Sequence, residues 1–274
     1  MTESTSATSE LGIYVCPACK QHLRQEEDTC RCLTCVQTYP IREGIPDFIR
    51  EKLSQSKDPV LKRMTAIDRI ARIYETKLWY APIMRLYGGL HSPSLAELIK
   101  TVTQKVQSAQ GRVLDVACGP GTYGRRIASS SKHVFGIDVS MGMLRQGAAY
   151  TAKEGIPHMH FARARVEALP FEDGFFDAAL CCGSLHLFAD TVIALREMAR
   201  VMKPAAILSV FTFTAGRAGI LRFRRVREWS QRNQGLHVFA LPELEQYLAA
   251  AGFEDFQPEV SGSTLTFSAR KQAV

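Results

Sequence analysis

The residues best suited to do chemistry lie in residues 113–124, VLDVACGPGTYG, where an acid and a glycine turn follow an apolar run. Gly119, Gly121 and Gly124 satisfy the spacing G-x-G-x-x-G, in which glycines bring backbone N–H groups close to a ligand. Asp115 argues against a dinucleotide, because a carboxylate just before the first glycine repels a pyrophosphate. An acid there suits a cofactor that carries an ammonium and a sulfonium group and no phosphate, which describes S-adenosylmethionine.

A second acid ends the next predicted strand. Residues 133–138 read HVFGID, and Asp138 lies 19 residues beyond Gly119. An acid about 20 residues after a glycine turn can accept hydrogen bonds from both ribose hydroxyls of a nucleoside. A helix N-cap or a surface charge is the alternative for an isolated acid, but the pairing with Asp115 favours the ribose role.

Five of the eight cysteines crowd together near the N-terminus. Cys16 and Cys19 form one C-x2-C pair, and Cys32 and Cys35 form another, with twelve residues between the pairs. Two such pairs supply four thiolates to one tetrahedral zinc ion, which is structural because no coordination position stays open. Disulfides are the alternative, but the polar start of the chain does not resemble a signal peptide. Cys30 is surplus by its spacing, either a bystander or a substitute for Cys32.

The elements that must position these residues alternate along the chain. Strands are predicted near 113–117, 133–138, 158–163, 175–182, 206–214, 253–258 and 264–270, and helices near 121–130, 141–153, 190–202, 218–232 and 241–251. Alternation of this kind predicts an α/β fold with a doubly wound, Rossmann-like parallel sheet. The short gap between the last two strands predicts a hairpin, and hence one antiparallel strand. Asp115, Asp138 and the turn after Cys182 then meet at the carboxyl edge of the sheet, where ligands bind.

Four motifs in this order resemble the class I S-adenosylmethionine-dependent methyltransferases, and among them the group with the ubiquinone and menaquinone methyltransferases. VLDVACGPG resembles the first motif of that family and GIDVSMGML the second, and ARVEALPFEDGFFDAAL and LREMARVMKPAAILSV resemble the next two. The resemblance implies a seven-stranded sheet that binds S-adenosylmethionine. It also implies cofactor contacts at Asp115, Ala117, Cys118, Gly119, Gly121, Asp138, Val139, Met143, Arg165, Val166 and Gly183.

Two positions depart from the family pattern. Arg165 stands where the family usually has an aspartate that accepts a hydrogen bond from the adenine amino group. Because arginine has donors and no acceptor, that contact falls to the backbone of Val166, or Arg165 points outward. Ala205 and Ala206 replace the usual glycine pair before the fifth strand, which predicts an altered turn there.

Methyl transfer from a sulfonium is an in-line displacement, for which an enzyme mainly aligns the nucleophile. His186, just after the fourth predicted strand, is the candidate general base, because a histidine can take a proton near neutral pH. A loop histidine that hydrogen-bonds the backbone is the alternative, and the sequence favours neither. His237 is a weaker candidate.

Residues 11–49 resemble the small zinc-ribbon domains that are similar to the partner subunit of tRNA and protein methyltransferases, through the cysteine pairs and the ending TYPIREGIPDF. The resemblance implies a non-catalytic module that selects substrate or packs against the neighbouring domain. We therefore expect a disordered tail over residues 1–10, a zinc ribbon over 11–49, a helical linker or cap over 50–108 and the methyltransferase domain over 109–274.

The net charge of +7 suits an anionic partner, although many enzymes with neutral ligands are this basic. Residues 217–232 hold six arginines against one glutamate, which fits a solvated helix face or a peripheral membrane contact. No apolar run approaches the 18 or more residues of a membrane span. Together with the polar N-terminus, this predicts a cytoplasmic protein.

The leading prediction is O- or C-methylation of a small apolar or aromatic molecule. The rival enzyme is an RNA base methyltransferase that recognises RNA through the zinc ribbon, and the non-enzymatic rival is an inactive cofactor-binding or interaction protein. Amino-directed nucleic-acid methyltransferases carry an NPPY-like tetrapeptide after the fourth strand, whereas this chain has CCGSLH there. That difference favours a small-molecule acceptor.

Overall fold

The computed structural model describes residues 11–51, 71, 74–90, 92–129, 132–215 and 218–273. The predicted tail over residues 1–10 lies outside the described residues, as do residues 52–70, 72–73 and 91 of the predicted cap over 50–108. The described part of that cap contains helices α2 (Lys77–Gly88) and α3 (Leu95–Lys105). Helix α3 begins at a capping box, in which the Ser94 hydroxyl accepts from the Glu97 N–H.

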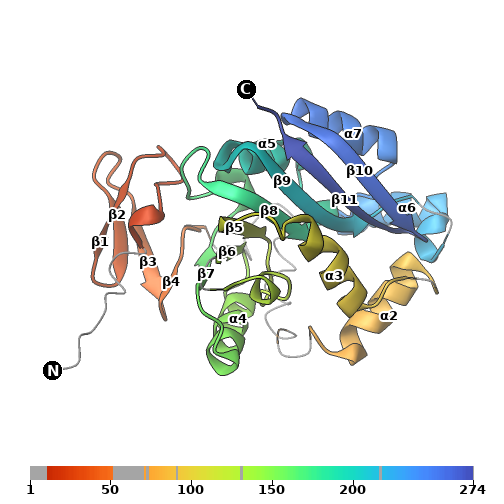
Figure 1. Cartoon of the computed structure of the whole chain (residues 1–274), viewed down its shortest axis with the longest axis horizontal. Helices are drawn as coiled ribbons and strands as arrows, with labels where there is room; N and C mark the ends of the chain where they lie inside the picture. The colour runs from red at the N-terminus through yellow and green to blue at the C-terminus, as the bar shows by residue number, and fades with distance from the viewer. Residues whose placement is uncertain are drawn as a thin grey trace.

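A seven-stranded sheet forms the centre of the fold (Figure 1). Its strands are β5 (Gly111–Val116), β6 (Lys132–Asp138), β7 (Met159–Arg163), β8 (Phe176–Cys182), β9 (Met202–Phe213), β10 (Phe253–Ser261) and β11 (Thr264–Lys271). Their order is β10-β11-β9-β8-β5-β6-β7, and β11 pairs antiparallel with both neighbours. The predicted doubly wound sheet with one antiparallel strand near the C-terminus is confirmed.

Successive residues of the central strands face two hydrophobic cores. Leu114 and Val116 of β5 belong to one core, and Val113 belongs to the other. The first core receives side chains from α5 (Thr191–Val201) and α7 (Leu241–Ala250), and the second receives them from α3 and α4 (Met141–Glu154). Helices therefore cover both faces of the sheet, and its carboxyl edge stays available for a ligand.

The predicted helix over residues 121–130 is wrong for its described part. Residues 121–129 form turns around one short 3-10 helix, η4 (Gly124–Arg126). Gly121 adopts φ +74°, a left-handed conformation that cannot begin an α-helix. Arg125 anchors these turns, because its buried guanidinium pairs with Glu75 and Glu154.

The helix predicted over residues 218–232 is divided in two. The structure has a short 3-10 helix, η7 (Ile220–Arg222), followed by α6 (Arg224–Gln234). Among the described residues, no helix combines the length and the apolar composition that crossing a membrane requires.

The N-terminal module is a four-stranded antiparallel sheet of β1 (Leu23–Glu26), β2 (Thr29–Cys32), β3 (Thr38–Arg42) and β4 (Ile45–Pro46). It lies beside β7, the edge strand of the large sheet (Figure 1). The chain that leaves β4 pairs with this edge, since Asp47 forms a parallel bridge with Arg163 and the Phe48 N–H donates to the Arg163 carbonyl over 2.8 Å. The module thus protects an edge strand that would otherwise expose its backbone.

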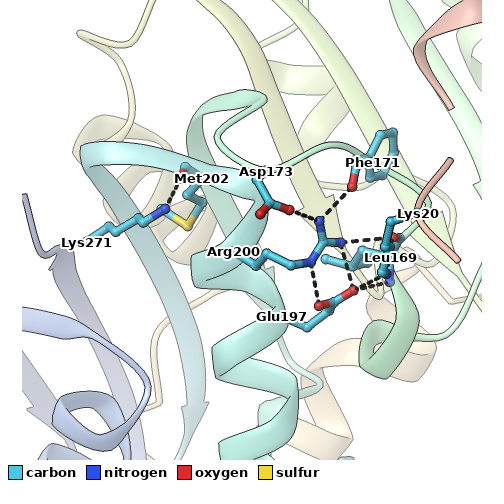
Figure 2. Close-up of polar contacts among 8 residues, drawn as sticks. All are labelled: Lys20, Leu169, Phe171, Asp173, Glu197, Arg200, Met202 and Lys271. Atoms are coloured by element: carbon cyan, nitrogen blue, oxygen red, sulfur yellow. Dashed lines mark hydrogen bonds and ion pairs between the residues drawn. The ribbon is translucent and has the colours of Figure 1, made fainter. Parts of the chain in front are cut away.

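A second set of contacts joins the module to the C-terminal half of α5 and to the loop before β8 (Figure 2). The ammonium of Lys20 donates to Glu197 over 2.9 Å and to the Leu169 carbonyl over 3.2 Å. Glu197 also accepts two hydrogen bonds from the Arg200 guanidinium, at 2.7 and 2.8 Å. Beside this network the Tyr14 ring packs on Phe171, with 5.4 Å between ring centroids. The small module and the large sheet therefore share one core.

Candidate functional site

A cleft opens at the carboxyl ends of β5, β6, β7 and β8, with about 860 Å³ of space that is partly open to solvent. Its walls are formed by Tyr74, Ala117, Gly119, Ile137, Asp138, Val139, Ser140, Met143, Ala164, Val166, Glu167, Cys182, Gly183, Ser184, Leu187, Phe188 and Ala189. Both sequence-predicted motifs, the glycine turn and the end of the second strand, contribute to these walls.

The glycine turn is held against the end of β6 by two hydrogen bonds. The Cys118 N–H donates to the Ile137 carbonyl over 2.9 Å, and the Gly119 N–H donates to Asp138 Oδ2 over 2.9 Å. Gly119 adopts φ +55°, and the nearest atom to an added Cβ would belong to Tyr74, 3.9 Å away. The turn therefore presents bare backbone to the cleft, which lets a nucleoside approach closely.

Asp138 ends β6 and borders the cleft, with 8% of its surface exposed. Its Oδ1 accepts from the Ser140 N–H over 2.8 Å, at the start of α4. The carboxylate is thus fixed in place by the backbone on both sides, and it has the acceptor chemistry that ribose hydroxyls require.

Asp115 lies deeper, at the end of β5, and is only 1% exposed. Its Oδ2 accepts from the Gly124 N–H over 3.0 Å, but its Oδ1 has no hydrogen-bond partner among the described residues. Burial raises the pKa of this carboxyl to about 7, and the charge of Asp138 adds to the rise. A buried carboxyl of this kind fits a cofactor that brings its own positive charge.

Cofactor affinity is expected to rise with pH between about 6 and 7.5, because the ionised form of Asp115 is the one that attracts an ammonium. One pH unit below a pKa of about 7 the carboxyl is mostly protonated. The free energy needed to ionise it then lowers the cofactor affinity about tenfold. Because folding raises the pKa of Asp115, this carboxyl stabilises the folded state most at pH values below 3.8, its ordinary pKa. That contribution to stability is lost as the pH rises through about 7.

Calorimetric titration of S-adenosylmethionine at several pH values measures this dependence. 5′-Methylthioadenosine is the matched control, since it keeps the adenosine and lacks the ammonium, and its affinity should not change over the same range. An S-adenosylmethionine affinity that is flat with pH in the wild type would contradict the role of Asp115.

Most of the predicted cofactor-contact residues line the cleft, and four of them do not. The cleft is lined by Ala117, Gly119, Asp138, Val139, Met143, Val166 and Gly183, and is not lined by Asp115, Cys118, Gly121 or Arg165. Cys118 and Gly121 support the turn from behind, since an added Cβ at Gly121 would touch Met159 and Phe161. Arg165 pairs with Glu51 over 2.8 Å and with Glu167 over 3.3 Å, so its side chain is held by acids and does not border the cleft.

The structure does not support His186 as a general base. The histidine lies on the 3-10 helix η6 (Leu185–Leu187), but its imidazole is buried and outside the walls of the cleft. Its Nδ1 lies 3.1 Å from the Thr212 hydroxyl, and burial lowers its pKa to about 4. The backbone of this residue also accepts from His237, which matches the structural alternative for a loop histidine.

A smaller pocket adjoins the cleft and shares Tyr74, Cys182 and Gly183 with it. Its other walls are Glu75, Tyr80, Leu95, Thr122, Tyr123 and Phe211. Glu75 ties this region to the glycine turn, because it accepts from the Thr122 hydroxyl over 2.7 Å and pairs with Arg125. Sequence reasoning missed Tyr74 as a site residue, since nothing in the local pattern of residues 50–108 shows which tyrosine returns to the glycine turn.

The four paired cysteines converge in the small module. Their sulfur atoms all lie within 4.8 Å of one another, with separations of 3.5 Å for Cys16–Cys35, 3.4 Å for Cys19–Cys32 and 3.5 Å for Cys19–Cys35. A tetrahedral zinc ion with Zn–S bonds of about 2.3 Å requires sulfurs about 3.8 Å apart. The Cys35 N–H donates to the Cys32 sulfur and lowers the pKa of that thiol to about 6, which favours the thiolate. Cys30 is buried outside this cluster.

The small module also supports one wall of the cleft through Arg163. The Arg163 Nη1 donates to both oxygens of Asp47, over 3.1 and 2.9 Å, and its Nε donates to the Val139 carbonyl over 2.8 Å. Ile49 packs against Val139 from the same side. Val139 follows Asp138 directly and borders the cleft, so Asp47 and Arg163 are placed to position this wall.

Replacing Asp47 with asparagine is expected to weaken S-adenosylmethionine binding about tenfold. The change removes the charge that holds Arg163 against Val139, and hydrogen bonds to charged groups contribute about 1.5–3 kcal/mol each. Calorimetric titration measures the effect. Asp255→Asn is the control, because Asp255 forms an exposed ion pair with Arg270 between β10 and β11. Equal affinities of Asp47→Asn and wild type would show that Asp47 does not position the wall.

Comparisons with known proteins agree with this geometry. The family model described as a methyltransferase domain matches residues 113–205. An uncharacterized chloroplastic methyltransferase of Arabidopsis thaliana is 24% identical over 96% of this chain and 79% of its own length. The ubiquinone/menaquinone biosynthesis C-methyltransferase of Bartonella tribocorum is 35% identical over 52% of this chain, which spans 53% of that enzyme.

Solved structures share the fold. The phosphoethanolamine N-methyltransferase 2 of Haemonchus contortus, in complex with phosphomonomethylethanolamine and S-adenosylhomocysteine, superposes with a TM-score of 0.61 at 17% identity, over 79% of this chain and 60% of that one. The sheet order, the glycine turn and the methyltransferase-domain model that matches residues 113–205 together support a class I S-adenosylmethionine-dependent methyltransferase.

Proposed function

We propose that the protein methylates a small aromatic acceptor of the quinol type, at a ring carbon, with S-adenosylmethionine held in the cleft. The aromatic pocket beside the cleft carries this proposal, because it is lined by Tyr80, Tyr123 and Phe211, whose aromatic side chains suit a flat apolar acceptor. Tyr74 borders both spaces and would stand between cofactor and acceptor. The relatives named for quinone methylation add support.

The polar groups around the two spaces also favour attack by carbon. Among the described residues, neither space is lined by a histidine or a lysine, and the carboxylate of Glu75 beside the smaller pocket is engaged by Thr122 and Arg125. S-adenosylmethionine supplies an electrophilic methyl group, and a hydroquinone ring activated by its own hydroxyls needs little help from a base. The S–CH3 bond would break as the C–CH3 bond forms, which releases S-adenosylhomocysteine, and the proton of the attacked ring carbon would then leave to solvent. The protein then acts by alignment and by excluding water from the pocket.

The test uses the full chain, labelled S-adenosylmethionine and a short-chain demethylnaphthoquinol. The same quinol already methylated at the acceptor carbon is the matched substrate control. We expect label in the unmethylated quinol only, with mass spectrometry placing the methyl group on carbon. Label in a hydroxyl oxygen would overturn the carbon assignment, and label in RNA with none in either quinol would favour the nucleic-acid alternative.

We further propose that the four clustered cysteines hold one structural zinc ion. The described residues bring four sulfurs and no additional candidate ligand into this cluster, so the ion would have no open position for chemistry. Its role is to hold together a module too small to bury an adequate core of its own. Through Asp47 and Lys20 that module then supports the methyltransferase domain.

Helix α6 suggests how an apolar acceptor is delivered. Phe223 and Trp229 are about half exposed, and Trp229 lies between Arg225 and Arg232 at helical spacings of four and three residues. Exposed aromatic rings among arginines fit the surface of an anionic membrane.

Sedimentation with lipid vesicles tests this contact. We expect the protein to bind vesicles rich in phosphatidylserine and to leave neutral vesicles alone, with Trp229→Ser weakening the binding several-fold. Val260→Ser is the control, since Val260 is an equally exposed apolar residue on β10. Equal binding to both kinds of vesicle, or no effect of Trp229→Ser, would rule out the contact.

A further inference from the structure

We propose that His133, His158 and His160 form a second metal site, which binds one divalent transition-metal ion through imidazole nitrogens. The three histidines lie at the amino ends of β6 and β7, whereas the cofactor cleft lies at the carboxyl ends. Neither the proposed methyl transfer nor the cysteine cluster involves them.

The pairing of β6 with β7 brings these histidines together. The register sets Val134 beside Met159 and Phe135 beside His160, and the Val134 N–H donates to the His158 carbonyl over 2.9 Å. His133 therefore lies next to His158, and the centroids of their rings are 4.1 Å apart. The His133 and His160 rings are 5.7 Å apart and nearly parallel. All three rings thus gather on one side of the sheet.

The distances fall close to those of a metal site. One ring nitrogen from each of the three histidines lies within 4.8 Å of the other two. Tetrahedral zinc with Zn–N bonds of about 2.0–2.1 Å requires nitrogens about 3.4 Å apart. The nitrogens must therefore approach by about 1.4 Å at most, which small rotations of half-buried side chains supply.

The ligand chemistry selects the ion. Imidazole suits zinc, nickel, cobalt and copper, and magnesium and calcium prefer oxygen ligands. Three protein ligands leave at least one position for water, so the site differs from the closed cysteine cluster. A bound ion would cross-link β6 to β7 at the edge of the sheet where the small module sits.

A cavity between the small module and β7 gives access to this site. His160 lines the cavity, which holds about 1050 Å³ of space that includes open solvent. Glu27 lines the same cavity, and its carboxylate favours a cation there, whereas the carboxylate of Glu43, also in the wall, pairs with Arg145 over 2.8 Å. The alternative is that the three imidazoles only stack on one another and on Phe135, whose ring centroid lies 4.7 Å from that of His160. The test must distinguish this packing from metal binding.

The test titrates Ni²⁺ into untagged full-length protein that already carries one zinc ion per chain, at pH 7.5 and without chelating buffer. Loss of an outer-shell partner alone costs about 10–100-fold in metal affinity, so loss of a ligand predicts a fall of at least about tenfold. His160→Gln and His133→Gln should each show that fall. His22→Gln is the matched control, because His22 is an exposed histidine on the small module that pairs with Glu172.

We expect one Ni²⁺ per chain in wild type and in His22→Gln, with the zinc retained. No nickel uptake by the wild type would overturn the proposal, as would His160→Gln and His133→Gln variants that bind like wild type. Co²⁺ added to the zinc-loaded wild type provides a readout that needs no variant. Weak visible Co²⁺ bands without thiolate charge-transfer absorption would support imidazole ligands. A spectrum without these visible bands, or one with thiolate charge-transfer absorption, would overturn the proposed site.

Discussion

Replacing Asp138 with alanine is expected to weaken S-adenosylmethionine binding about 100-fold or more. The carboxylate accepts from the Gly119 and Ser140 backbone N–H groups, and we propose that it also accepts from the ribose hydroxyls. The variant loses the ribose contact and leaves two N–H groups at the cleft without their acceptor. A 100-fold loss corresponds to about 2.7 kcal/mol, in line with hydrogen bonds to a charged group at about 1.5–3 kcal/mol each.

Asp177→Ala is the matched control for this measurement. Asp177 lies near the start of β8, at the opposite end of the sheet, and likewise accepts from a backbone N–H, that of Arg112, over 2.8 Å. Its loss should lower stability without changing cofactor affinity. If Asp138→Ala bound S-adenosylmethionine as tightly as Asp177→Ala, the ribose role of Asp138 would be wrong.

Replacing Cys32 with serine is expected to release the zinc ion and unfold the small module. Apparent binding free energies of structural zinc reach about 10–16 kcal/mol, and a module of this size folds only with its ion. The Tyr14–Phe171 contact and the Lys20–Glu197 pair would be lost with the module, so the melting temperature of the whole chain should fall. Metal analysis and thermal unfolding measure the two effects.

Cys30→Ser is the control that distinguishes the loss of a zinc ligand from the loss of a buried thiol that binds no metal. Cys30 is as buried as Cys32 and two residues away, but its sulfur lies outside the cluster, and burial raises its pKa to about 11. This variant should keep one zinc ion per chain. Zinc retained in Cys32→Ser and lost in Cys30→Ser would reverse the ligand assignment.

The sheet was predictable from sequence because its signals are local. Each parallel strand contains apolar residues and is bounded by turns, and the short loop at Gly262 forces the last two strands into a hairpin. The meeting of Gly119 with Asp138 was predictable for the same reason, since both residues sit at the ends of neighbouring strands.

The features of the fold and the site that could not be predicted from the sequence depend on contacts between distant parts of the chain. The pairing of Asp47 with Arg163 joins residues 116 positions apart, and that of Arg165 with Glu51 joins residues 114 apart. No local pattern identifies such partners, so the sequence predicts that the small module can pack against the neighbouring domain but not which residues join it to the wall of the cleft. For His186 the sequence predicts the position of the backbone, just after the fourth strand. It does not predict the direction of the side chain, which points into the core beside Thr212.

Calorimetric titration of the purified full chain with S-adenosylmethionine, with NAD as the control ligand, tests the central claim most directly. We predict one site per chain with micromolar affinity for S-adenosylmethionine and no measurable binding of NAD. Absence of S-adenosylmethionine binding by folded, zinc-loaded protein, or equal binding of NAD, would contradict the assignment of the cleft.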